Sequence, residues 1–228
     1  MDEGSEAGAL TDEIRFAEQK FENYRTALQR EGQRLIVFMS VYRRIHERRH
    51  DRLDALNLAP TFFQTVLASL HASIVVGAHA LFNGGGGNEE SLRTFLGFVG
   101  RNIGLFGLGQ LSRRKGWPMN HENMRHRQAP TIATVREDRK TVDRIESLKS
   151  VAKRRNKIHA HLDAECFLDP TPLADEAPIR WKDLTELRDT FVSLVNRYSS
   201  AYDANTFVFE PLNIHDVDDV VEILWKAS

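Results

Sequence analysis

Residues 153–163 read KRRNKIHAHLD and concentrate four cations, one amide, two imidazoles and one carboxylate in a single short stretch. The stretch closes a run of helical spacing that begins near Ile132 and continues to about His161. Apolar residues in this run recur mostly every three or four positions, which is the period of one face of an α-helix. The sequence therefore predicts a long charged helix with these polar groups at its C-terminal end.

Helical spacing extends through most of the remaining chain. The expected elements are a helix from Thr11, a segment from Leu35 that becomes strongly basic, a helix over 61–82 started by Pro60, helical spacing from Leu92 to Val99, a helix from Leu184 to about Ala204, and a final helix from Asp216 to about Lys226. No run of strands is present, and only residues 207–209 have a short extended pattern. We therefore predict an all-α fold, a helical bundle with additional N- and C-terminal helices. Residues 1–10 are expected to be disordered, and residues 11–228 to form one domain.

The composition excludes several classes of protein. The chain has 228 residues and a formal net charge of −1, which argues against wholesale nonspecific binding to nucleic acid or anionic lipid. Its single cysteine, Cys166, cannot form an intramolecular disulfide and fits a reducing cytoplasm. The longest apolar stretch, 67–82, is shorter than the roughly 20 residues that a membrane span needs. We expect a buried core helix there, with His71 and His79 as core histidines, and a cytoplasmic protein that does not bind a membrane.

The residue types in 153–163 suit phosphoryl chemistry on RNA. A histidine has a pKa near neutrality, so it can take the proton of a 2′-hydroxyl or give one to the leaving oxygen. An arginine binds a phosphate through two nitrogens and can stabilise the charge that develops on it. An asparagine can orient either partner. The bland alternative is a solvated basic face, since cations near a helix C-terminus also suit the helix dipole.

Three segments carry a resemblance to a known family. Arg155-Asn156 and His161, with five residues between Arg155 and His161, resemble the Arg/His motif of the HEPN superfamily. The wider string over 155–163 looks like its abortive-infection AbiU-like branch, and so do two other stretches, within 81–92 and 183–202. Together the resemblance covers roughly residues 35–204, with the three segments in the order that the family has.

The resemblance implies a helical bundle that is usually dimeric, with the Arg/His motifs of two protomers facing each other. Many members are metal-independent ribonucleases of toxin–antitoxin or phage-defence systems, whereas others bind RNA, nucleotide or a partner protein without catalysis. The expected catalytic residues are therefore Arg155, Asn156 and His161, with no metal and no cofactor. The expected partners are RNA, a second copy of the chain, and an antitoxin protein.

A helical wheel sets a condition on this site. On a regular helix of about 3.6 residues per turn, Arg155 and His161 lie about 120° apart, whereas Arg155 shares a face with His159. Arg154 and His161 are nearly aligned. Either the helix is distorted inside the motif, or the cooperating arginine and histidine come from opposite protomers. Arg154, His159 and Asp163 are therefore secondary candidates.

Further cations could contact the RNA backbone. We expect this of Lys153 and Lys157 within the motif, and of Arg44 and Arg48 in the basic segment after Leu35. A solvated helix face is an equal alternative for the two arginines.

Other patterns fail as sites. His121 and His126 are five residues apart, so they cannot form the zinc-protease box, in which the histidines are four apart. A zinc site from His159, His161 and Cys166 is disfavoured, since histidines two residues apart on a helix diverge. The four glycines of 84–87 lack the lysine of a phosphate-binding loop.

Overall fold

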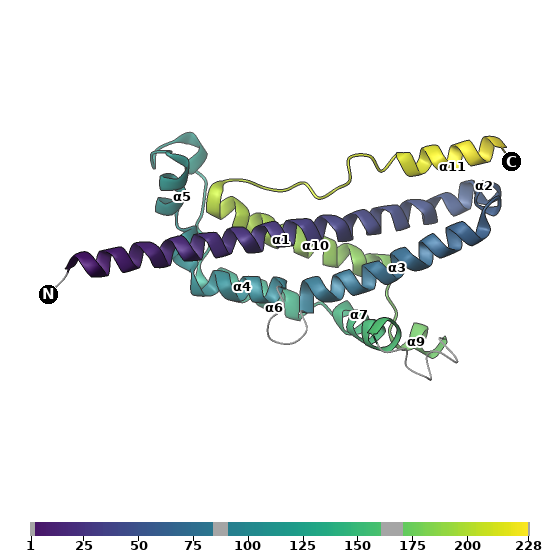
Figure 1. The fold of residues 1–228 in the computed structure, drawn as a ribbon, viewed down its shortest axis with the longest axis horizontal. Coiled ribbons are helices and arrows are strands. Elements are labelled where there is room, and N and C mark those ends of the chain that lie inside the picture. The colour runs from purple at the N-terminus through teal and green to yellow at the C-terminus, as the bar shows by residue number, and fades with distance from the viewer. Residues whose placement is uncertain (1–2, 84–90, 161–170, 228) are drawn as a thin grey trace. The chain divides into compact units, whose positions relative to one another are not determined.

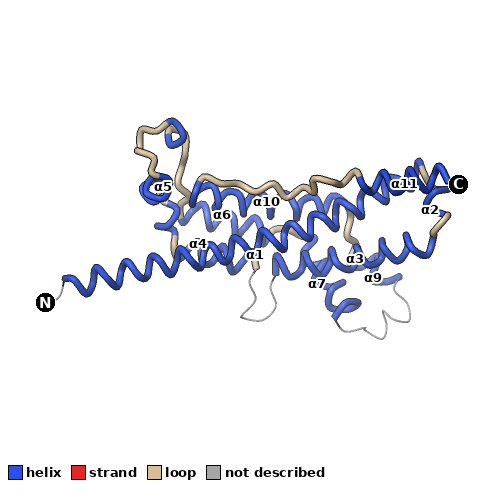
Figure 2. Tube along the Cα trace, turned by 45° about the horizontal axis from the view of Figure 1, so that its top comes forward, coloured by secondary structure: helices blue, strands red, loops and turns tan. Residues whose placement is uncertain are grey.

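The computed structural model describes residues 3–83, 91–160 and 171–227, and these residues form helices and loops without a strand (Figure 2). The predicted all-α class is therefore confirmed. The chain divides into two compact units. Unit 1 comprises residues 1–30, 82–145 and 189–207, and unit 2 comprises residues 31–81, 146–188 and 208–228.

The first helix, α1 (Glu3–Asp51), is one uninterrupted element (Figure 1). The sequence had indicated a helix that starts at Thr11 and a separate segment from Leu35, but the helix starts at Glu3 and continues through Gly32 into that segment. A glycine inside a helix costs roughly 0.5–1 kcal/mol, which is small beside the burial of the apolar side chains around it. Leu28, Leu35 and Ile36 are all buried on either side of Gly32.

Unit 1 is built around an aromatic core. Its helices are α4 (Leu92–Arg101), η1 (Ile103–Phe106), α5 (Leu108–Lys115), η2 (Glu122–Met124), α6 (Ile132–Asp143), and the parts of α1 and α10 (Trp181–Asp203) that belong to it. Phe21 lies at the centre, with ring-centroid distances of 5.0 Å to Phe106 and 4.4 Å to Tyr202. Such aromatic contacts contribute more than their buried area alone.

A buried carboxylate joins α6 to α10 within unit 1. Asp138 accepts a hydrogen bond of 2.5 Å from the Tyr198 hydroxyl and forms an ion pair with Arg197. Burial, followed by the hydrogen bond to Asp138, raises the pKa of Tyr198 well above its ordinary value. The hydroxyl therefore stays a donor at any physiological pH.

Unit 2 contains the predicted motif. Its elements are the C-terminal part of α1, α2 (Leu53–Asn57), α3 (Pro60–Asn83), α7 (Ser147–Arg154), η3 (Arg155–Ala160), α9 (Thr171–Glu176), the start of α10, and α11 (Asp216–Ala227). The chain reverses direction at α2, so that α3 runs back along α1 (Figure 1). Ile45, Leu56, Phe63 and Val221 form a buried cluster that holds α1, α2, α3 and α11 together.

The long helix expected from Ile132 to His161 is interrupted. α6 ends at Asp143 and α7 begins at Ser147, and the boundary between the two units falls between Ile145 and Glu146. Val142, Ile145, Leu148 and Val151 are spaced by three throughout and all are buried. The spacing of buried apolar residues is therefore continuous across the break, although the residues on its two sides belong to different units. The spacing alone could not reveal where the helix ends.

α3 is less buried than its composition predicts. It has no charged residue, yet Phe62 is 60% exposed and Val76 is 43% exposed. The expected fully buried core helix is therefore wrong, because only one side of α3, including Ile74, Val75 and Ala78, is covered. Among the described residues, α3 is the one helix long and apolar enough to cross a membrane, with 28% of its most apolar window buried. One such helix is weak evidence for a membrane span.

Three charged side chains clasp α11 to α1 within unit 2. Arg44 Nε lies 2.9 Å from both carboxylate oxygens of Asp218, and Arg48 Nε lies 2.7 Å from one of them. The hydrogen bonds from Arg44, and then those from Arg48, hold the pKa of Asp218 well below its usual range. The ionised carboxylate therefore stabilises the folded state.

This clasp predicts a pH-dependent loss of stability in Asp218→Asn. We expect its melting temperature at pH 7 to fall by about 2–4 °C. Because the pKa of Asp218 is lowered on folding, the contribution is complete above about pH 3.9 and is lost as the pH falls through the folded-state value. The melting curves of wild type and variant should therefore converge in acid. Asp219→Asn, in the same exposed first turn of α11, is the matched control, and an equal loss there would contradict the clasp.

Candidate functional site

The helix type changes inside the motif. α7 keeps α-helical geometry to Arg154, and η3 continues as a π-helical turn over Arg155–Ala160. Such turns are rare and occur frequently at functional sites. The wheel of a regular α-helix therefore does not apply beyond Arg154, and a distorted helix is one of the two alternatives that the motif's spacing left open. His159 lies in η3 but its side chain is outside the described part of the structure, and His161 and Asp163 lie outside the described residues.

Arg154 has a structural position. Its side chain is half-buried, and Nε donates a hydrogen bond of 2.5 Å to the carbonyl oxygen of Ala177, a fully buried residue. Burial lowers the pKa of the Arg154 guanidinium from its ordinary value. The bond ties α7 to the segment that leads into α10. Arg154 thus serves as an anchor in this unit.

Arg155 and Asn156 lie next to each other with their polar groups paired. Arg155 Nη1 donates to Asn156 Oδ1 over 3.0 Å, and Asn156 is exposed. No carboxylate among the described residues forms an ion pair with Arg155. A half-buried guanidinium that no described carboxylate pairs with is suited to a phosphate, and its bond to Asn156 holds its orientation. Of the two arginines, the structure therefore favours Arg155 for contact with a substrate.

The two motif lysines flank an acidic side chain from α9. Lys153 forms an ion pair with Glu176, and this bond, together with the nearby charge of Lys157, lowers the pKa of Glu176. The carboxylate neutralises part of the basic surface. The prediction that Lys153 and Lys157 contact RNA remains a prediction.

The two arginines of α1 that were expected to contact RNA form ion pairs with α11. Arg44 and Arg48 both bind Asp218, so their charges are already compensated within unit 2. Their role as RNA contacts also stays a prediction, and it would require the RNA to compete with Asp218.

A cavity of about 500 Å³ lies in the same unit and was not predicted. Its wall consists of residues from α1, α3 and the start of α10, namely Tyr42, Arg43, His46, Glu47, His50, His71, Ile179, Trp181 and Leu184. Tyr42 and Arg154 influence each other's pKa, so the cavity lies close to the motif. His71 therefore lines a cavity, contrary to its interpretation as a core histidine. A signal in the sequence was the spacing of Tyr42 and His46, four residues apart and on one helix face.

Residues 18–223 match the family model HEPN AbiU2. The chain belongs to the AbiU2 family of HEPN proteins. The match confirms the family suggested by the sequence and marks the chain as an abortive-infection HEPN domain. No curated protein and no solved structure matches the chain.

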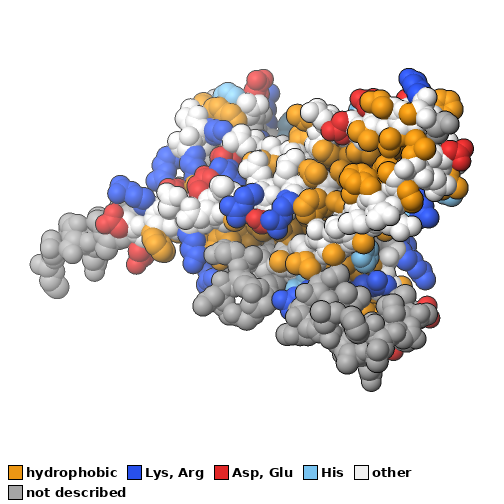
Figure 3. Space-filling model, turned by 45° about the vertical axis from the view of Figure 1, so that its right-hand side comes forward, with side chains coloured by type: hydrophobic (Ala, Val, Ile, Leu, Met, Phe, Trp, Pro, Cys, Tyr) orange, Lys and Arg blue, Asp and Glu red, His pale blue; other side chains and the backbone are white. Residues whose placement is uncertain are grey.

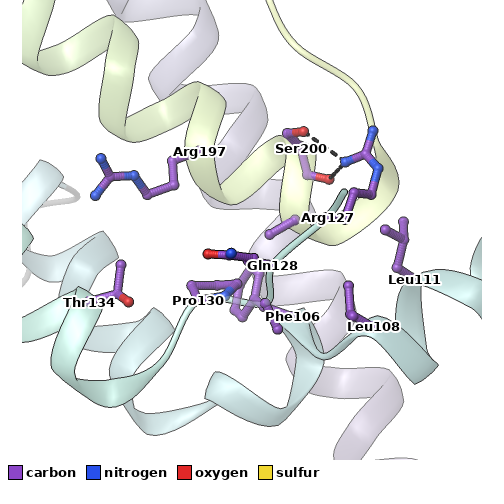
Figure 4. A pocket seen from close by; sticks show the side chains of 11 residues that line it. Phe106, Leu108, Leu111, Arg127, Gln128, Pro130, Thr134, Arg197 and Ser200 are labelled. Atoms are coloured by element: carbon purple, nitrogen blue, oxygen red, sulfur yellow. Dashed lines mark hydrogen bonds between the residues drawn. The ribbon is translucent and has the colours of Figure 1, made fainter. Parts of the chain in front are cut away.

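A second cavity of this AbiU2 HEPN chain lies in unit 1, with a volume of about 390 Å³ (Figure 4). Two arginines line it, and both are already bound: Arg127 donates to the backbone and hydroxyl oxygens of Ser200, and Arg197 pairs with Asp138. The described residues that line this cavity all belong to unit 1 and include none of the motif.

The described residues offer no site for a metal ion. They contain no group of three or more His, Cys, Asp or Glu side chains arranged to hold a metal ion. His121, in the rejected zinc box, instead stacks on Trp117 with a ring-centroid distance of 5.2 Å.

The different surroundings of Arg154 and Arg155 predict different effects of mutation. Arg154→Ala should lower the free energy of unfolding by about 1–3 kcal/mol, because it leaves the buried carbonyl of Ala177 without a donor. Arg155→Ala should change it by less than about 0.5 kcal/mol, because within the described part of the chain its side chain bonds to the exposed Asn156 alone. Chemical denaturation followed by circular dichroism measures both values. Equal losses in the two variants would overturn the assignment of Arg154 as the anchor.

Proposed function

We propose that this AbiU2 HEPN chain is a metal-independent endoribonuclease of a phage-defence or toxin–antitoxin system, acting in the cytoplasm. The observation that carries the proposal is the pair of half-buried Arg155 and exposed Asn156 in a π-helical turn, where Arg155 has no acidic partner among the described residues. The family supports an abortive-infection role, and the motif supports chemistry on a phosphodiester.

The reaction needs one proton acceptor and one phosphate-binding cation. The 2′-oxygen of a ribose attacks the adjacent phosphorus, the bond from phosphorus to the 5′-oxygen breaks, and a 2′,3′-cyclic phosphate forms. His161 takes the proton of the 2′-hydroxyl or gives one to the leaving 5′-oxygen. Arg155 stabilises the additional negative charge of the phosphorane-like transition state, and Asn156 orients the arginine or the phosphate.

The site is proposed to be composite, with Arg155 of one copy of the chain acting beside His161 of a second copy. The uncharged surface of α3 supports this arrangement. Phe62, Thr65, Ser69, Val76 and Ala80 are all exposed and are spaced along one side of a helix without any charge. An uncharged stripe that exposes large apolar side chains such as Phe62 and Val76 is typical of an interface between proteins. A second copy can bury it and bring two motifs together.

A non-catalytic role is the competing proposal. An HEPN module that only binds RNA, nucleotide or a partner protein would use the same cations for affinity. It would show binding without turnover, with a salt dependence set by the number of phosphate contacts. An antitoxin protein that keeps the ribonuclease silent would be recognised by growth arrest that its co-expression relieves.

Cleavage of RNA in EDTA tests the reaction. Wild type should cleave, whereas Arg155→Ala and His161→Ala should each lower kcat by about 10²–10³-fold, since each removes one transition-state interaction. Arg136→Ala, which removes an exposed arginine of α6, is the control and should retain full activity. Equal rates in all four proteins would remove the motif from the mechanism. Activity that disappears only in EDTA would point to a metal enzyme.

Mixing two inactive variants tests the composite site. Arg155→Ala and His161→Ala should each be inactive alone, but a heterodimer contains one site with both native side chains and should recover cleavage. If arginine and histidine cooperate within one chain, mixing restores nothing.

The interface is tested by adding Val76→Glu to both variants. A carboxylate forced into an apolar interface costs several kcal/mol, so the recovery should be lost and sedimentation should show monomers. Ile223→Glu, at an exposed apolar position on α11, is the matched control and should leave both the dimer and the recovery intact. Dissociation by Ile223→Glu alone would place the interface on α11 instead, where Figure 3 also shows hydrophobic side chains near the C-terminal end of unit 2.

A further inference from the structure

The cavity of unit 2 has two aromatic walls. On α1 and α3, the Tyr42 ring lies 4.5 Å from the His46 ring and 6.2 Å from the His71 ring, measured between centroids. Trp181 lines the cavity from the start of α10, with the Arg43 guanidinium 5.2 Å from its ring centroid. A cavity of about 500 Å³ is within the range of natural sites for small organic groups. Its walls favour a flat aromatic ligand.

The polar groups inside the cavity suit a neutral ligand better than a phosphate. Burial, and then the charge of Arg49, lowers the pKa of His46, so its ring is neutral at pH 7 and offers one donor and one acceptor. Burial raises the pKa of Tyr42, so its hydroxyl keeps its proton. Arg43, the cation in the wall, is paired with Glu47 at 2.6 Å. Hydrogen-bonding groups beside aromatic rings are the means by which proteins recognise unpaired bases.

The position of the cavity connects it to the motif. Burial raises the pKa of Tyr42, which lines the cavity, and the charge of the Arg154 guanidinium partly offsets that rise. Arg154 Nε also donates a hydrogen bond to the carbonyl oxygen of Ala177, two residues before Ile179 in the cavity wall. Arg155 follows Arg154 directly in the chain. A nucleotide whose phosphate is bound by Arg155 would therefore have a neighbouring base within reach of this cavity.

We propose that the cavity formed by Tyr42, His46, His71 and Trp181 binds one unpaired base of a single-stranded RNA. The inference rests on the proposed function, because it assumes that the motif binds the adjacent phosphate. Stacking on Trp181 supplies affinity, and His46 and Tyr42, which also line the cavity, meet the polar edge of the base. Paired bases cannot enter, so the cavity selects single-stranded segments, whereas the motif alone reads only the backbone.

Binding to an oligonucleotide that cannot be cleaved isolates the cavity from catalysis. The probe is a short unstructured 2′-O-methyl RNA, which lacks the attacking hydroxyl, with its Kd measured by fluorescence anisotropy. Trp181→Ala should raise Kd by about 10- to 100-fold, the effect of one stacked base. Trp181→Phe should restore most of the affinity, and His46→Ala should weaken binding without removing the tryptophan. Trp117→Ala, which removes a tryptophan stacked on a histidine in unit 1, is the matched control and should change nothing.

Abasic substitutions locate the bound base. In wild type, one abasic position should weaken binding as much as Trp181→Ala does, and in Trp181→Ala the same substitution should have no further effect. Independent, additive losses would overturn the proposal. Fully paired RNA should bind wild type and Trp181→Ala equally. A nucleoside monophosphate that binds as tightly as the oligonucleotide would overturn RNA as the source of the base, and an unchanged Kd in Trp181→Ala would overturn the site itself.

These measurements separate the two proposals. If the oligonucleotide binds in a Trp181-dependent manner but no RNA is cleaved, the ribonuclease proposal fails and the cavity assignment stands. If RNA is cleaved with the same KM and kcat by wild type and Trp181→Ala, the ribonuclease proposal stands and the cavity assignment fails.

Discussion

The hydrogen bond from Arg154 Nε to the Ala177 carbonyl is the contact on which the arrangement of unit 2 depends. It fixes the C-terminal end of α7 against the segment that leads into α10, and so brings the motif and Trp181 into one region of the chain. The bond from Nε to the backbone and the partial burial of its side chain hold the Arg154 guanidinium in place. The neighbouring Arg155, one residue on, is left to the surface. The two adjacent arginines therefore differ in their partners: Arg154 bonds to the backbone and Arg155 to the side chain of Asn156.

Several arginines of unit 2 form ion pairs with carboxylates, which compensate part of the positive charge on its surface. Arg44 and Arg48 bind Asp218, and Arg43 binds Glu47. Arg52 pairs with Glu222 and lies 4.5 Å from the ring of Trp225. The basic segment of α1, which in the sequence suggested a track for nucleic acid, therefore works largely to attach α11 and to line a cavity. Arg155, by contrast, has no ion pair with a carboxylate among the residues that the structure describes, and the proposed phosphate contact is assigned to it for that reason.

Much of the fold could be predicted from periodicity, whereas its interruptions could not. The helix starting at Pro60 and the C-terminal helix from Asp216 were expected from local patterns and are present. The break between α6 and α7 was missed because Val142 to Val151 keep one spacing across two units. The continuity of α1 was missed because a glycine was given more weight than the burial around it. In both cases tertiary burial decided the structure, and local propensity did not.

The candidate site, too, could be predicted from the sequence only in part. Arg155 and Asn156 are contiguous, so a sequence motif could identify them, and the helical wheel already offered the distortion that η3 provides as one of two alternatives. The cavity is built from three segments far apart in the chain, and no local pattern relates Tyr42 to His71 and Trp181. The motif and the cavity are linked by what recognition of an RNA substrate requires. A cleavage site that holds only a phosphate cannot distinguish one RNA segment from another, because every nucleotide carries the same phosphate. In the proposed site, the aromatic cavity near Arg155 supplies the missing discrimination, and its half-buried aromatic residues also contribute to the packing of unit 2.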